Sequence, residues 1–187
     1  MMKALKYLCL LMTGLLASTN SIAESPEPAG QAETLQPQPA PCSAAEYRQF
    51  DFWLGSWTAY DADGERRLGT NQLTPLLNGC GMMENWSNQG YEGTSVNFYD
   101  AESGTWHQTW IDNQGGHLFL QGGQHEQGMR LSGERLDEDG ATVIDRITWT
   151  PLADGRVRQF WEVSKDQGQS WETAFDGYYQ RDSEASP

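Results

Sequence analysis

The stretch Gly93–Asp112, GTSVNFYDAESGTWHQTWID, contains two segments with alternating side-chain character, separated by a short turn. Side chains alternate between the two faces of a β-strand, so the pattern predicts a hairpin of two antiparallel strands. If residues 101–104 form the loop, Asp100 pairs with Thr105. The same register places Tyr99, Asn97 and Ser95 opposite Trp106, Gln108 and Trp110.

Turns that contain glycine recur along the chain at intervals of 11 to 15 residues, which is the length of one strand and one turn. Connections this short join antiparallel neighbours, and a long meander closes because closure removes exposed strand edges. We therefore expect an all-β, about ten-stranded antiparallel up-and-down barrel. A sandwich usually needs longer crossovers. The turns are Asp63-Gly64, Asn78-Gly79, Gln89-Gly90, Ser103-Gly104, Gly115-Gly116, Gln127-Gly128, Asp139-Gly140, Asp154-Gly155 and Gln167-Gly168.

One short N-terminal helix is expected before the first strand. Ser43 and Glu46 have the spacing of a capping box, which predicts a helix to about Phe50 that could close one barrel end. Two cysteines, Cys42 and Cys80, flank this region, and we expect a disulfide between them. The alternative is a pair of buried thiols.

The chain begins with features of a secretory signal peptide over residues 1–23: two lysines, a short apolar run and a small-residue cleavage site. Residues 24–41 are rich in proline and predict a disordered tether. The barrel domain is expected over residues 42–182 and a disordered tail over 183–187. This organisation predicts a periplasmic or secreted protein without membrane insertion, because the apolar run is too short to span a bilayer.

The protein is strongly acidic, with a formal net charge of −14 for the full sequence. A field of this sign repels nucleic acid, so we expect no nucleic-acid partner. A small molecule is the expected partner, and the oligomeric state is left open.

Two assignments of the strand faces compete. Val96, Phe98, His107 and Ile111 point inward in one of them. In the other, which we favour because tryptophan has the largest area to bury, the inward residues are Asn71, Glu84, Trp86, Ser95, Asn97, Tyr99, Trp106, Gln108, Trp110 and Asp112. Counting back from the Asn78-Gly79 turn also places Leu73 on that face.

An interior that mixes indoles with amides and carboxylates is typical of a ligand pocket. We therefore expect these ten residues to bind a small apolar or aromatic ligand. A hydrogen-bonded network that only fixes strand register, in a filled structural or interaction module, is the alternative.

An enzyme that uses Glu84 and Asp112 as general acid and base is a further alternative, because desolvation would raise the pKa of at least one carboxyl. Each carboxylate could instead be held by Arg146, Arg158 or a neighbouring amide. No nucleophile–base pair occurs at a defined spacing, so we do not expect catalysis. The separated histidines predict no metal site.

Five ordered motifs resemble those of a broad family of bacterial exported proteins of unknown function: FDFWLGSW (Phe50–Trp57), GCGMMENW (Gly79–Trp86), GTSVNFYD, WHQTWID and SKDQGQSW. More distantly, Gly55-Ser56-Trp57 with Arg181 resembles the lipocalin and calycin signature. That resemblance implies that Arg181 from the last strand covers Trp57 and closes the barrel. The ten-stranded nitrobindins among these barrels hold haem through a late histidine. Here no histidine follows His125, so no cofactor is expected.

Overall fold

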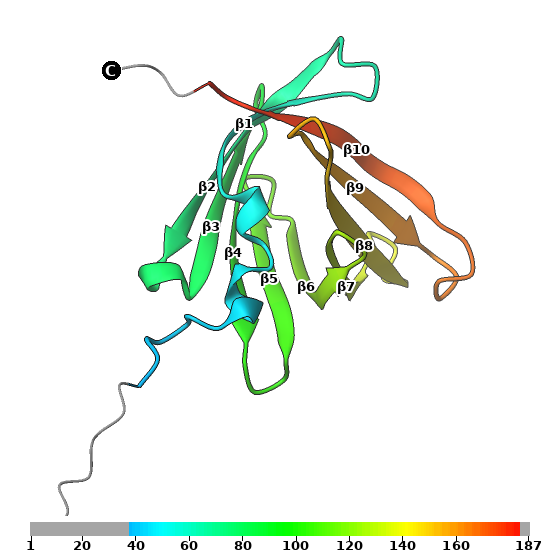
Figure 1. Cartoon of the computed structure of the whole chain (residues 1–187). Coiled ribbons are helices and arrows are strands. Elements are labelled where there is room, and N and C mark those ends of the chain that lie inside the picture. The colour runs from blue at the N-terminus through cyan, green and yellow to red at the C-terminus, as the bar shows by residue number, and fades with distance from the viewer. Residues whose placement is uncertain (1–37, 184–187) are drawn as a thin grey trace, which may run out of the picture. The chain divides into compact units, whose positions relative to one another are not determined.

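Ten strands follow one another as an up-and-down meander, and the last strand pairs with the first to close a barrel (Figure 1). The computed structural model describes residues 38–183, and the ten strands lie within them. The prediction of an all-β antiparallel barrel is confirmed. The strands are β1 (Gly55–Tyr60), β2 (Arg67–Leu76), β3 (Gly81–Ser87), β4 (Glu92–Asp100), β5 (Thr105–Asp112), β6 (His117–His125), β7 (Gly128–Leu136), β8 (Thr142–Pro151), β9 (Val157–Ser164) and β10 (Glu172–Arg181).

The expected signal peptide (1–23), most of the expected tether (24–41) and most of the expected tail (183–187) lie outside the described residues. Within residues 38–183, no helix combines the length and the hydrophobicity that crossing a membrane requires.

The two hairpins predicted in detail have the expected registers. In β4–β5, Asp100 pairs with Thr105 and Asn97 pairs with Gln108. In β2–β3, Leu73 pairs with Glu84. Because side chains alternate along every strand, these registers determine which residues enter the barrel.

The turn between β2 and β3 is the short η3 turn (Leu77–Gly79). Asn78 and Gly79 both have positive φ, at 57° and 90°, and the N–H of Cys80 donates to the carbonyl of Leu77 over 3.3 Å. These are features of a type I′ turn, in which asparagine and glycine tolerate the left-handed backbone.

The expected helical segment before β1 is present as two 3₁₀ turns, η1 (Ala45–Arg48) and η2 (Asp51–Trp53). The prediction of a capping box at Ser43 and Glu46 is wrong. The residue that precedes the first turn is Ala44 and not Ser43. Within the described chain, no side chain makes a capping hydrogen bond to this turn.

Tertiary contacts, and not a helix cap, stabilise the η1–η2 segment. The indole Nε1 of Trp106 donates to the carbonyl of Glu46 (3.2 Å) and to Oε1 of Gln49 (3.1 Å). Cys42 is bonded to Cys80, which confirms the predicted disulfide and ties the start of the segment to the β2–β3 turn. The two turns are therefore anchored to the barrel at both the cysteine and the indole.

The barrel closes where β1 meets β10. Trp57 and Arg181 are paired residues of these strands, and the guanidinium carbon of Arg181 lies 4.2 Å from the Trp57 ring centroid. Arg181 Nη1 also donates to the carbonyl of Leu54 over 2.7 Å. Gly55 leaves room for this arginine, because a Cβ there would meet Nη1 at 2.1 Å, and its φ of +127° also favours glycine.

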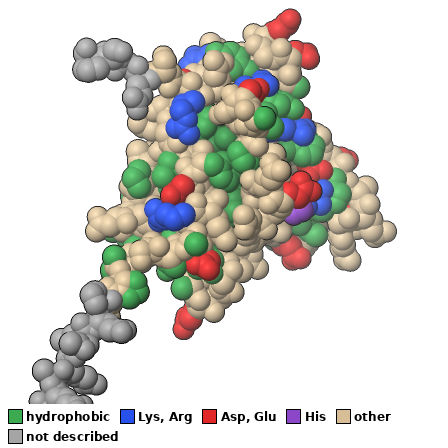
Figure 2. Space-filling model, in the orientation of Figure 1, with side chains coloured by type: hydrophobic (Ala, Val, Ile, Leu, Met, Phe, Trp, Pro, Cys, Tyr) green, Lys and Arg blue, Asp and Glu red, His purple; other side chains and the backbone are tan. Residues whose placement is uncertain are grey.

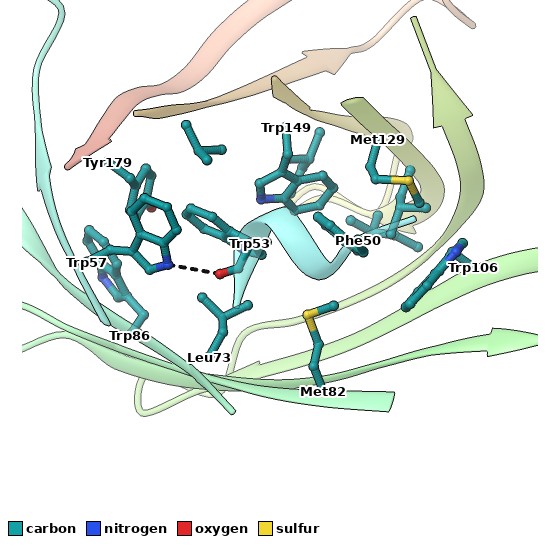
Figure 3. Close-up of a cluster of buried hydrophobic side chains, with 14 of the residues drawn as sticks. Phe50, Trp53, Trp57, Leu73, Met82, Trp86, Trp106, Met129, Trp149 and Tyr179 are labelled. Carbon is teal, nitrogen blue, oxygen red and sulfur yellow. Dashed lines mark hydrogen bonds between the residues drawn. The ribbon is translucent and has the colours of Figure 1, made fainter. Parts of the chain in front are cut away.

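One end of the interior is filled by aromatic side chains around η2 (Figure 3). The Phe50 ring packs edge-on against Trp106 (5.6 Å between centroids) and Trp149 (5.2 Å). Trp53 packs against Tyr179 at 4.6 Å, and its carbonyl accepts a hydrogen bond from Trp57 Nε1 (2.9 Å). Trp106 lies near the start of β5 and Trp149 near the end of β8, so η1 and η2 plug the barrel end where these two meet.

The surface shown in Figure 2 carries interspersed acidic and basic side chains among apolar ones. Several arginines are engaged with neighbouring acids: Arg146 with Glu162 (2.9 Å) and Arg158 with Asp176 (2.8 Å). These two arginines therefore do not hold Glu84 or Asp112, as one alternative from the sequence allowed.

Replacing both Cys42 and Cys80 by serine should lower the free energy of unfolding by about 4 kcal/mol, because the crosslink restricts an unfolded loop of 38 residues. Urea unfolding monitored by tryptophan fluorescence measures the change. Reduced wild-type protein is the matched control and should lose a similar amount. Unchanged stability in both samples would contradict a stabilising role for the disulfide.

Replacing Arg181 by alanine should cost about 1–2 kcal/mol of unfolding free energy, because the stacking on Trp57 and a charged hydrogen bond are lost together. Arg181→Lys should recover only part of this, since lysine lacks the planar fork. Arg156→Ala, which removes an exposed arginine paired with nearby Asp154, is the control. If both alanine variants unfold at the same urea concentration, the contact between Arg181 and Trp57 contributes nothing to stability.

Candidate functional site

A cavity of about 160 Å³ occupies the part of the barrel interior farther from the helical plug. Its walls come from Trp86 near the end of β3, Trp110 near the end of β5, Leu118 near the start of β6 and Phe175 near the start of β10. These positions meet at the end opposite to Trp106 and Trp149. The cavity reaches the surface beside the β3–β4 turn, where Asn88 is exposed.

Burial distinguishes the two assignments of the strand faces. Val96, Phe98 and Ile111 are 39 %, 40 % and 55 % exposed, whereas the opposite face of the same strands is buried or partly buried. The aromatic and polar face therefore points inward.

The ten residues expected to bind ligand occupy four different places. Glu84, Trp86, Gln108 and Trp110 line the cavity. Asn71, Ser95 and Asn97 are buried around Glu84. Tyr99 and Trp106 pack at the plugged end, where Tyr99 contacts Tyr47 at 5.2 Å between ring centroids. Asp112 is the last residue of β5; it does not line the cavity but lines the hollow beside it.

Glu84 is the centre of a buried polar network on β2–β5. It is 3 % exposed, and its carboxylate accepts hydrogen bonds from Asn71 Nδ2 (2.7 Å), Ser95 Oγ (2.7 Å) and Gln108 Nε2 (3.3 Å). Burial raises the pKa of Glu84, and the bonds from Ser95 and Asn71 offset part of this effect. Its partners are amides and a hydroxyl, as one alternative from the sequence allowed.

Two acceptor atoms of the network lack a donor within residues 38–183. Asn97 Nδ2 donates to Ser95 Oγ over 2.8 Å. Among the described residues, however, no donor reaches the buried Oδ1 of Asn71 or of Asn97. Buried polar atoms are normally paired, so unpartnered acceptors mark a place where further donors are favourable.

Sequence reasoning did not identify two thirds of the cavity wall. The missed lining residues are Asn88, Tyr91, Leu118, Ile147, Gln159, Trp161, Phe175 and Tyr179. The register of the hairpin around the Asp154-Gly155 turn pairs Trp161 with Ile147 and could have identified Trp161 as an inward residue. The position of Phe175 is harder to predict, because the β9–β10 register shifts between Thr173 and Phe175.

A second carboxylate, Asp145, was also missed and faces the barrel interior from β8. It is 1 % exposed, and Arg135 Nε donates to its Oδ2 over 2.7 Å. The indole of Trp161 donates to Oδ1 over 2.8 Å. The charge of Asp145 is therefore balanced by an arginine, whereas Glu84 has only neutral hydrogen-bond donors.

Asp112 has the opposite environment to Glu84. Although partial burial acts to raise its pKa, donation from the backbone N–H groups of Gly116 and Gln114 and from the Tyr91 hydroxyl lowers it below 3.8. Asp112 thus stabilises a turn as an ionised side chain. It does not share the cavity with Glu84, so the two do not form the acid–base pair considered from the sequence.

A larger hollow of about 480 Å³ adjoins the cavity on its β6–β7 side and shares Tyr91, Trp110, Leu118 and Trp161 with it. Pairing between β6 and β7 runs from His125 with Gly128 to Gln121 with Ser132. Residues 117–120 of β6 lie beyond this pairing, although the Phe119 carbonyl still lies close to Gly133 of β7. Residues of both strands line the hollow there.

No histidine is among the described residues that line the cavity. His107 stacks on Phe98 on the outer face at 5.2 Å, and His117 lies beside the exposed Phe119. Within residues 38–183, no cluster of three or more His, Cys, Asp or Glu side chains has the geometry to hold a metal ion.

Neither a protein-family model nor a curated protein matches the sequence. The fold established here is a closed ten-stranded antiparallel barrel. The resemblance to exported proteins of unknown function and to calycins remains an expectation from the motifs.

The raised pKa of Glu84 makes stability depend on pH. Between the ordinary value of 4.5 and the higher folded value, the unfolded chain releases this proton while the folded chain keeps it. The contribution is therefore complete below pH 4.5 and is lost as the pH rises through the folded pKa. The unfolding free energy of wild type should decline relative to that of Glu84→Gln across this interval.

Urea unfolding between pH 4 and pH 8 tests this expectation. Glu172→Gln, which removes an exposed carboxylate beside Lys165, is the control and should follow the wild-type profile. Parallel profiles for wild type and Glu84→Gln would show that burial does not shift the titration of Glu84.

Proposed function

We propose that this protein is an exported binding protein that holds a small aromatic or largely apolar molecule in the cavity between Trp86, Trp110 and Trp161. The observation that carries the proposal is the contrast between the two barrel ends. One end is densely packed around Phe50, whereas the other encloses a cavity with aromatic walls and few polar groups. Small-molecule sites commonly have this composition.

The size of the cavity favours a ligand of about one or two rings. An apolar cavity of roughly 150 Å³ is large enough for benzene, and this one measures about 160 Å³. The adjoining hollow beside Leu118 offers room for a substituent and a route of entry between β6 and β7.

The polar groups of the lining support specificity. Glu84 and Gln108 present oxygen and nitrogen atoms on one side, and Gln159, which accepts from the Tyr179 hydroxyl at 2.7 Å, lies on another. A few fixed polar atoms within apolar walls orient a ligand. A barrel filled along its whole length, the structural alternative, would not need such a lining.

Export to the periplasm or the medium is part of the same proposal. The disulfide between Cys42 and Cys80 fits an oxidising compartment. The paired Trp57 and Arg181 at the start and end of the barrel support a relationship to calycin-like binding proteins.

Isothermal titration with indole tests the proposal. Wild-type protein should bind, and Trp110→Ala should weaken binding by about 10-fold, because a wall of the cavity is removed. Trp171→Ala is the matched control: this tryptophan stacks on Arg146 at 3.6 Å and is not part of the cavity.

Thermal unfolding in saturating indole provides a second measurement. A ligand at 100 times its dissociation constant stabilises the folded state by about 2.7 kcal/mol. Indole should therefore raise the melting temperature of wild type and Trp171→Ala more than that of Trp110→Ala. Equal responses in the two variants, or none in wild type, would argue against the cavity as a binding site.

A further inference from the structure

We propose that the ligand of this cavity is an organic cation, an aromatic or alkyl ammonium whose charged nitrogen pairs with Glu84. This inference rests on the proposed function and specifies the chemical class of its ligand. It is carried by the arrangement of one buried carboxylate among aromatic rings, with no basic side chain in the described lining.

The charge balance of the interior points to a cation. Of the two buried carboxylates in the barrel, Asp145 is neutralised by Arg135, whereas the partners of Glu84 are neutral. Burying an ionised carboxylate without a counter-charge is costly. A ligand that brings a positive charge would supply for Glu84 what Arg135 supplies for Asp145.

The walls suit the same ligand. The faces of aromatic rings attract cations, most strongly in indole, and ammonium ligands are typically held in cages of such rings. Here Trp86, Phe175 and Tyr179 pack edge-to-face, with centroids 6.0 Å apart for Trp86–Phe175 and 5.8 Å for Trp86–Tyr179, and all three line the cavity with Glu84. A cation in the cavity would lie beside both a carboxylate and these rings.

The hydrogen-bond inventory agrees. The carboxylate of Glu84 lines the cavity and accepts from three donors, none of which is charged. An ammonium group has N–H donors and no acceptor. The acceptor atoms of Glu84 therefore favour an ammonium over a carboxylate or phosphate ligand, which the acidic protein would also repel.

Binding of a cation should be coupled to the release of a proton. Without a ligand, Glu84 retains its proton to higher pH because burial raises its pKa. Pairing with an ammonium requires the ionised form of Glu84. The O–H bond of the Glu84 carboxyl breaks, the proton passes to the buffer, and no other bond changes.

Of the described groups that face Glu84, those on β2, β4 and β5 are the neutral Asn71, Ser95 and Gln108. On β10, Tyr179 stays neutral because burial and the charge of Glu84 raise its pKa.

Three probes with the same phenyl-ethyl frame test the inference: phenethylamine, 2-phenylethanol and 3-phenylpropionate. For wild type, calorimetry at pH 7 should give at least about 10-fold tighter binding of the amine than of the alcohol, and no measurable binding of the anion. Glu84→Gln should reduce the ratio of the amine affinity to the alcohol affinity to below about 3-fold. Glu172→Gln, which removes the same charge from the outer surface, should behave as wild type.

The outcomes separate this inference from the proposed function. Binding of the alcohol as tightly as the amine would overturn the inference and leave an aromatic-binding cavity in place. Failure of all three probes, together with failure of indole, would overturn both.

Wild type alone provides a test if Glu84→Gln does not fold. Between pH 5 and pH 8 phenethylamine stays charged, and its affinity should rise with pH as Glu84 ionises more readily, with proton uptake by the buffer. The affinity of 2-phenylethanol should not rise with it. Flat affinities for both probes and no proton release would overturn the inference.

Discussion

The pairing of β1 with β10 is the constraint on which the rest of the structure depends. It joins residues 57–60 to residues 178–181 and converts a ten-stranded meander into a ring. In a ring every second side chain must enter the interior, and both strand edges are removed. The Arg181 guanidinium covers Trp57 at this seam, and Gly55 is small enough to let it approach. Closure therefore depends on side-chain packing as well as on backbone hydrogen bonds.

The interior is divided because the plug fills only one end. The disulfide at Cys42 and the indole of Trp106 hold η1 and η2 against that end, where Phe50 and Trp53 are almost completely buried. Ten strands enclose more space than the side chains of the opposite end fill, so a cavity remains between Trp86, Trp110 and Trp161. Rigid packing at one end thus supports a preformed hollow at the other.

The two buried carboxylates, Asp145 and Glu84, differ in whether a charged partner balances them, and the residues next to them in the sequence do not reveal this difference. Asp145 meets Arg135 and the Trp161 indole, whereas Glu84 meets two amides and a hydroxyl. In a low-dielectric interior an unbalanced charge is unfavourable, which is why burial raises the pKa of Glu84. The same imbalance makes this position selective for a partner that carries the missing positive charge.

Alternation and turn chemistry are local properties, so the sequence by itself determined the ten strands and the β4–β5 register. It favoured the inward face that carries Glu84, Asn71 and Gln108, and burial in the folded barrel decided between that face and the opposite one. The sequence pattern predicts a capping box at Ser43, but the Trp106 hydrogen bond and the Cys42 disulfide stabilise this segment without one. Only the tertiary structure decided that Trp106 belongs to the plug and Trp110 to the cavity, that Asp112 stabilises a turn, and that Trp161 and Phe175 complete the wall. The physical reason is that depth along a barrel depends on strand stagger, a β-bulge and the position of the plug, and all three arise from contacts between residues distant in the chain.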